Sequence, residues 1–180
     1  TLMQKTEFIL AVDLDHTLID TDMIYLGLKY LLIRKIYLIP FLVTLLILQG
    51  KPRAKKFLYD HTCISIEHLP YNSSIINFIK NNKDNYLHII LISGSYYKYV
   101  ESIAKYLKLF DLSVGTTLSV NMISFNKVNY LKKKYNEMSF DYIGDSKKDI
   151  PIWEAARNAF VVDRGNITKH LKHINYKTIS

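Results

Sequence analysis

With 180 residues, 49% of them hydrophobic and 22% charged, the chain can form one packed domain and does not have the composition of a disordered segment. Its 24 basic and 16 acidic residues give a formal net charge of +8, which favours anionic partners such as phosphates or acidic headgroups. The single cysteine, Cys63, excludes an internal disulfide and a cysteine-rich zinc site, so we expect a cytoplasmic, reducing location.

The first apolar run, Phe8 to Leu14, predicts a buried strand. Asp13 and Asp15 lie at its carboxyl end. Carboxylates crowded at the end of a buried strand repel one another and are costly to desolvate, so they are tolerated mainly where a cation neutralises them. The alternative interpretation is a strand that simply runs into an acidic turn.

Residues 21–69 depart from the pattern of the rest of the chain, because they are helical in periodicity and unusually apolar. We expect helices at about 23–33 and 36–48, then the basic run 51–56 and a third helix. The uncharged stretch 36–48 is shorter than the roughly 20 residues that a membrane-spanning helix needs. We therefore interpret residues 21–69 as a helical cap inserted into a core domain of residues 1–20 and 70–180. A helical extension that only adds core, and shallow membrane contact through the apolar and basic segments, are the alternatives.

After residue 69, apolar runs alternate with helical periodicity, which predicts an α/β fold with a parallel sheet and helices on its faces. The expected strands are 88–93, 112–116, 140–144 and 159–162, and the expected helices are 97–107, 127–135 and 150–157. The carboxyl ends of parallel strands meet at one edge of the sheet, where ligands bind. Asp145 and Asp149 are therefore expected near Asp13 and Asp15. Four carboxylates without cysteine or clustered histidine favour Mg²⁺ over zinc, and calcium is less suited to phosphate chemistry.

Four segments in order resemble the motifs of the haloacid dehalogenase (HAD) superfamily of phosphohydrolases. They are Asp13-Leu14-Asp15-His16-Thr17-Leu18, Ser93, Lys127 and Gly144-Asp145-Ser146-Lys147-Lys148-Asp149. The resemblance extends from about residue 8 to residue 163 and implies the HAD fold, a Rossmann-like parallel sheet flanked by helices. The segments 69–72, 140–146 and 150–156 further resemble the HAD-like domains associated with UbiA-type prenyltransferases.

The resemblance implies a Mg²⁺-dependent phosphatase that works through an aspartyl-phosphate. Asp13 would be the nucleophile and a metal ligand, and Asp15 would be the general acid and base. In the family the metal is also held by positions that match the main-chain carbonyl of Asp15 and the side chain of Asp145, and Asp149 would complete or orient that set. Members of the family that act on carbon–halogen bonds lack the aspartate that Asp15 matches, so a phosphatase is favoured over a dehalogenase.

The resemblance also implies a phosphate-binding set. Ser93 and the main-chain amides of Gly94 and Ser95, expected at the start of the following helix, would bind the phosphoryl oxygens. The alternative for Ser93 is a helix cap with no further role. Lys127 would neutralise the phosphoryl charge, and it is preferred to the other lysines nearby because it stands at the start of its helix. Those other lysines are Lys132, Lys133 and Lys134.

An apolar, tyrosine-bearing cap with a basic margin suggests two substrate classes. One is a lipid, prenyl or other small phosphate, and the other is a phosphoprotein that carries phosphotyrosine. The competing hypothesis is a catalytically inactive HAD-fold domain that binds a partner or, peripherally, a membrane. A nucleic-acid partner is not expected, because the basic residues form no concentrated stripe.

Overall fold

The computed structural model describes residues 7–136, 138–165 and 167–179. At its centre lies a six-stranded sheet in the order β3-β2-β1-β4-β5-β6, in which all neighbouring strands are parallel. The strands are β1 (Ile9–Val12), β2 (His88–Tyr96), β3 (Leu112–Thr116), β4 (Phe140–Gly144), β5 (Asn158–Val161) and β6 (Tyr176–Thr178). The predicted fold class, a parallel sheet flanked by helices, is confirmed.

Seven α-helices and five short 3-10 helices connect the strands in the described ranges. The α-helices are α1 (Met23–Arg34), α2 (Ile39–Gln49), α3 (Lys51–His61), α4 (Ser73–Asn82), α5 (Tyr97–Leu107), α6 (Phe125–Lys134) and α7 (Ile150–Ala155). The 3-10 helices are η1 (Ile36–Leu38), η2 (Ile66–His68), η3 (Lys83–Asn85), η4 (Lys147–Asp149) and η5 (Ile167–His170).

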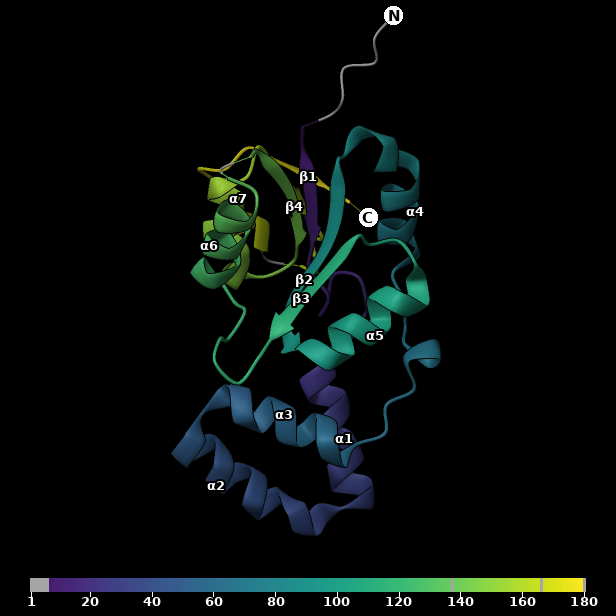
Figure 1. The fold of residues 1–180 in the computed structure, drawn as a ribbon, viewed down its shortest axis with the longest axis vertical. Coiled ribbons are helices and arrows are strands. Elements are labelled where there is room, and N and C mark those ends of the chain that lie inside the picture. The colour runs from purple at the N-terminus through teal and green to yellow at the C-terminus, as the bar shows by residue number, and fades with distance from the viewer. Residues whose placement is uncertain (1–6, 137, 166, 180) are drawn as a thin grey trace, which may run out of the picture.

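Helices cover both faces of the sheet, with α4 and α5 on one side and α6 and α7 on the other (Figure 1). Successive side chains of a strand point to opposite faces, and β1 follows this rule. Leu10 and Val12 pack in the apolar cluster that includes α4 and α5, whereas Ile9 and Ala11 pack in the cluster that includes α6 and α7. Because β1 is central and buried on both faces, the position of the residue that follows it, Asp13, is tightly determined.

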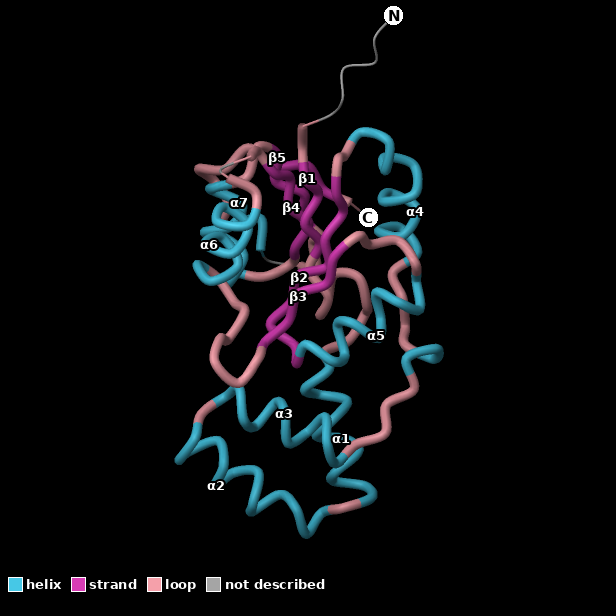
Figure 2. The backbone as a smooth tube through the Cα atoms, in the orientation of Figure 1, coloured by secondary structure: helices cyan, strands magenta, loops and turns pink. Residues whose placement is uncertain are grey.

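The first three helices form a separate group beyond the carboxyl ends of the strands (Figures 1 and 2). We call α1, η1, α2 and α3 the helical module. Asp22 begins it, because its side chain accepts hydrogen bonds from the N–H groups of Ile24 and Tyr25 and so caps the amino end of α1. The module has a small core of its own, made by Leu31, Leu42, Ala54, Phe57 and Leu58.

Hydropathy sets the module's helices apart from the others. Among the described residues, no single helix is long and apolar enough to cross a bilayer. Taken together, α1 and the segment Ile36–Gln49 are long and apolar enough, but the chain bends by 118° between them.

Several element boundaries differ from prediction. β1 ends at Val12, because the carbonyl of Leu14 accepts hydrogen bonds from the N–H groups of the three residues Thr17 to Ile19 and so closes a turn. α7 ends at Ala155, because the N–H of Arg157 already bonds to the carbonyl of Phe140 and draws the chain onto the sheet. α4 and the short edge strand β6 were not among the predicted elements.

Candidate functional site

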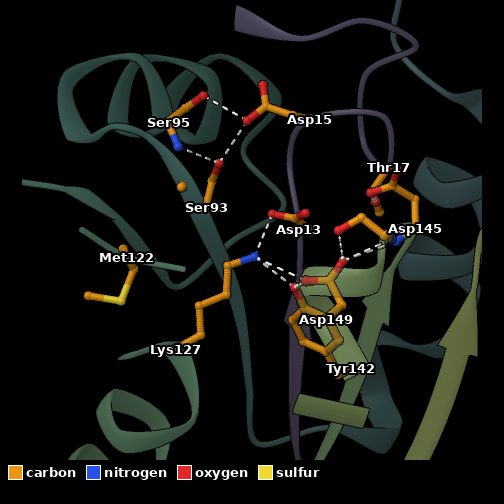
Figure 3. A network of polar contacts seen from close by, with 12 residues as sticks. Asp13, Asp15, Thr17, Ser93, Ser95, Met122, Lys127, Tyr142, Asp145 and Asp149 are labelled. Atoms are coloured by element: carbon orange, nitrogen blue, oxygen red, sulfur yellow. Dashed lines mark hydrogen bonds and ion pairs between the residues drawn. The ribbon is translucent and has the colours of Figure 1, made fainter. Parts of the chain in front are cut away.

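The ends of three adjacent strands bring the predicted site residues to one edge of the sheet (Figure 3). Asp13 directly follows β1, Ser93 lies within β2, and Asp145 directly follows β4. A pocket of about 130 Å³ lies at this edge, between the sheet and the helical module. Among its lining residues are Asp13, Asp15, Gly94, Lys127, Asp145 and Asp149.

A buried ion pair joins Asp13 to Lys127, the third residue of α6. The Lys127 Nζ donates to Asp13 Oδ1 at 2.7 Å and to the Tyr142 hydroxyl at 2.7 Å. Burial raises the pKa of Asp13 to about 8, although the charge of Lys127 acts against this. Burial also disfavours the charged form of Lys127, but Asp13 and Asp149 outweigh it and raise the lysine pKa. The amino group is therefore a cation, as expected of a group that neutralises an anion.

Asp149 is held in position by several hydrogen bonds. Its Oδ1 accepts from the Tyr142 hydroxyl at 2.7 Å, and its Oδ2 accepts from the N–H and the hydroxyl of Ser146, both at 3.1 Å. The N–H of Asp145 donates to the same oxygen at 3.3 Å. Gly144 permits this approach, because a Cβ at that position would lie 2.8 Å from Asp149 Oδ2. The predicted motif is thus a compact turn that directs two carboxylates to the pocket.

Three carboxylates of the site could hold a metal ion. Asp13, Asp145 and Asp149 each place one oxygen within 4.8 Å of the others. Burial and the neighbouring Asp149 raise the pKa of Asp145 to about 6, which is the expected effect of crowding acids in a buried site. All three donors are hard oxygen atoms, and the single positive charge of Lys127 does not neutralise three carboxylates. The donor set therefore fits Mg²⁺.

The side chain of Asp15 lies apart from this cluster, on the other side of the pocket (Figure 3). Its Oδ1 accepts from the N–H of Met23 at 2.9 Å, and its Oδ2 accepts from the hydroxyls of Ser95 at 2.7 Å and Ser93 at 3.2 Å. Burial, and secondarily the charge of Asp22, raise the pKa of Asp15. A carboxyl group with a raised pKa can both donate and accept a proton near neutral pH, as the predicted general acid and base must. Its expected metal contact through the main-chain carbonyl stays a prediction.

Ser93 lies in a strand, as predicted, but the expected placement of Gly94 and Ser95 at the start of a helix is wrong. β2 continues through them to Tyr96, which pairs with Thr116 of β3 after a shift in register, and α5 begins only at Tyr97. Ser93 does not cap that helix. Its hydroxyl instead accepts the N–H of Ser95 at 3.0 Å. Gly94 lines the pocket, and the phosphate-binding roles of Ser93 and Gly94 stay predictions.

Lys55 also lines the pocket, and the sequence reasoning missed it. The lysine comes from α3, whose basic residues were interpreted only as the margin of the cap. Its Nζ donates to the carbonyl of Gly94 at 2.6 Å and to Asn121 Oδ1 at 2.7 Å, and burial lowers its pKa to about 8. A signal was present, because Lys55 is three positions before the buried Leu58 and so shares its helix face.

His16, the residue after Asp15, adopts a backbone conformation that is rare for residues other than glycine. Its φ of +57° lies in the left-handed region, which glycine adopts without strain.

Comparisons with known proteins support the fold. No family model matches the sequence. The "Uncharacterized protein y4nM" of Sinorhizobium fredii is 30% identical over 117 residues, which cover 65% of this chain and 22% of that protein. The chain thus spans less than a quarter of the length of this curated relative.

Three solved structures share the fold over nearly all of the chain. A HAD family hydrolase from Salmonella enterica has a TM-score of 0.66 at 14% identity, covering 97% of this chain and 68% of the other. Apo phosphoserine phosphatase has a TM-score of 0.67 at 15% identity, with 95% and 92% covered. A phospho-aspartyl intermediate analogue of phosphoserine phosphatase has a TM-score of 0.59 at 14% identity, with 93% and 98% covered. These structural neighbours are HAD-superfamily hydrolases, and at such identities the likeness concerns the fold. None of them is described as a prenyltransferase-associated domain, so that finer resemblance stays a prediction.

Proposed function

We propose that this chain is a Mg²⁺-dependent phosphomonoester hydrolase that uses Asp13 as its nucleophile. The observation that carries the proposal is the buried contact between Asp13 and Lys127 inside a carboxylate cluster. A site built only to bind a cation gains nothing from a lysine, because the two positive charges repel. A ligand that brings its own negative charge, as a phosphate ester does, accounts for the lysine and the carboxylates together.

The side chains divide the reaction between them. Lys127 neutralises the phosphoryl oxygens, and an Asp13 oxygen attacks phosphorus while the bond to the leaving oxygen breaks. Asp15 donates its proton to that leaving oxygen. Asp15 then takes a proton from water, which attacks phosphorus, releases phosphate and restores the Asp13 carboxylate. A Mg²⁺ ion held by Asp13, Asp145 and Asp149 would withdraw further charge from the phosphoryl group.

We further propose that residues 21–69 act as a cap over this site. Ile24 of α1 and Lys55 of α3 both line the pocket, so the helical module closes one side of it. About 130 Å³ is enough for a phosphoryl group but well below the roughly 300–1,000 Å³ of a pocket that encloses a whole ligand of drug size. This volume supports a substrate that inserts only its phosphorylated end. A lipid or prenyl phosphate, another small phosphate and a phosphotyrosine side chain all meet that condition.

The test is release of phosphate from p-nitrophenyl phosphate with and without Mg²⁺. We expect turnover that needs Mg²⁺ and that falls more than about a thousandfold in Asp13→Asn. Asp20→Asn serves as the matched control, because Asp20 is an exposed aspartate paired with Arg164. If a folded protein turned over no phosphomonoester, the inactive-domain hypothesis would replace this proposal, and activity that survived in Asp13→Asn would refute the choice of nucleophile. Prenyl phosphates, sugar phosphates and phosphotyrosyl peptides then separate the substrate classes.

A further inference from the structure

The α2 helix is apolar around its whole circumference, yet most of it is exposed. It carries no charged residue, and Leu42 is its one buried residue. Helices that are apolar all round are normally enclosed by protein or lipid. Figure 1 shows α2 at the end of the molecule farthest from the sheet, with α3 between it and the strands. This face is therefore open to a partner that does not touch the sheet.

Exposed apolar side chains extend from η1, just before α2, to the carboxyl end of α2. Before it, Ile36 and Tyr37 of η1 are 65% and 72% exposed. At its carboxyl end, Ile47 and Leu48 are 75% and 74% exposed. Isolated exposed apolar residues are ordinary, but a continuous apolar surface of this kind marks an interaction site.

Basic residues accompany the apolar surface at both ends. Between Met23 and Tyr59 the chain has seven lysines and arginines and no aspartate or glutamate. Three of the seven face inward or bond locally. Lys55 enters the pocket, Lys35 donates to the carbonyl of His61 at 2.9 Å, and Lys56 pairs with Asp60. Exposed members remain beside the apolar residues, with Arg34 before η1 and Lys51 and Arg53 after α2.

We infer that α2 and its two ends form a docking surface for an anionic lipid bilayer. Apolar side chains flanked by lysine and arginine match the layering of a membrane interface, where acyl chains lie beneath acidic headgroups. The same charge argues against a second copy of this chain, because pairing two such faces would bring two sets of uncompensated positive charges together. The inference is independent of the phosphatase proposal, since no residue of the pocket contributes to it.

The test is sedimentation of the 180-residue chain with vesicles of phosphatidylcholine alone and of phosphatidylcholine mixed equally with phosphatidylserine. We expect binding to the mixed vesicles that weakens as salt is added. The double variant Ile47→Ser, Leu48→Ser should weaken it by about tenfold or more, because two large apolar contacts with the acyl region are lost. Leu87→Ser, an exposed apolar residue directly before β2 and so at the end of the sheet opposite the module, should have no effect.

A second pair of variants tests the charge alone. Lys51→Gln with Arg53→Gln should weaken binding to the mixed vesicles by about fivefold per charge removed, whereas Lys80→Gln with Lys83→Gln on the α4 side should not. Circular dichroism and thermal unfolding establish that each variant is folded. Absence of vesicle binding, or binding unchanged in the Ile47 and Leu48 variant, would overturn the inference. Self-association that the same variant abolishes, without vesicle binding, would assign the surface to a second copy.

Discussion

Asp13 and Lys127 are 114 positions apart in the chain, yet their charged groups meet at 2.7 Å at the buried edge of the sheet. β1 presents the carboxylate and the first turn of α6 presents the lysine. A buried pair of this kind is weak evidence for stability, since desolvation offsets much of its Coulomb energy. In the proposed reaction, the pair matters because it places a positive charge where the phosphoryl group would bind.

Replacing Lys127 should lower the rate of phosphate release, whereas replacing an exposed lysine of the same helix should not. Lys127→Met should lower kcat for p-nitrophenyl phosphate by about 10²- to 10³-fold, because a preorganised positive charge next to the nucleophile is removed. Lys133→Met, an exposed position on the same helix, should leave the rate unchanged. If kcat fell strongly in the Lys133 variant and not in the Lys127 variant, the assignment of Lys127 would be wrong.

Asp15→Asn should stop proton transfer while leaving the metal cluster intact. An amide cannot give a proton to the leaving oxygen, so we expect kcat to fall by about 10²- to 10⁴-fold. The Asp15 side chain is not one of the three clustered carboxylates, so Mg²⁺ should still raise the melting temperature of the variant as it does in the wild type. Loss of that Mg²⁺ effect would indicate that Asp15 acts chiefly in binding the metal.

Lys55 links the helical module to the core and places a positive charge in the pocket. In Lys55→Met the ammonium bonds to Gly94 and Asn121 are lost, and we expect KM for an anionic substrate to rise by about tenfold, with a smaller change in kcat. Lys56→Met is the matched control, because Lys56 is the adjacent lysine and pairs with Asp60 on the surface. An unchanged KM in Lys55→Met would mean that the lysine neither attracts the substrate nor shapes the pocket.

Stabilisation by Mg²⁺ should increase with pH. The pKa values of Asp13 and Asp145, about 8 and about 6 without metal, lie above the value of about 3.9 in an unfolded chain. The folded protein therefore keeps protons that the unfolded chain has released, and metal-free stability falls as pH rises from about 4 to about 8. Mg²⁺ must displace those protons to bind. It therefore binds more tightly at high pH, where the carboxyl groups have already lost them.

Thermal unfolding with Mg²⁺ and with a chelator measures this effect. The increase in melting temperature on adding Mg²⁺ should be larger at about pH 8.5 than at about pH 5, and it should be much reduced in Asp145→Asn. An increase that is equal at both pH values, or greater at the lower one, would contradict assignment of these carboxylates as metal ligands.

Some features could not be anticipated because they depend on how distant segments pack. The strand that contains Ser93 was expected to end there, but pairing of Tyr96 with Thr116 extends it past Gly94. The position of Lys55 depends on how α3 lies against β2, and a local pattern shows only that this residue shares a face with Leu58. The Tyr142 hydroxyl likewise meets Lys127 only because β4 and α6 lie side by side.

The sequence by itself determined the parallel sheet and the convergence of Asp13, Asp145 and Asp149. Alternating strand and helix patterns are local, and parallel strands must bring their carboxyl ends to one edge. Only the tertiary structure decided which lysine of the cap enters the pocket, how Asp15 is separated from the metal cluster, and that α2 is left uncovered. These follow from the packing of whole elements against one another, which depends on contacts between residues far apart in the chain.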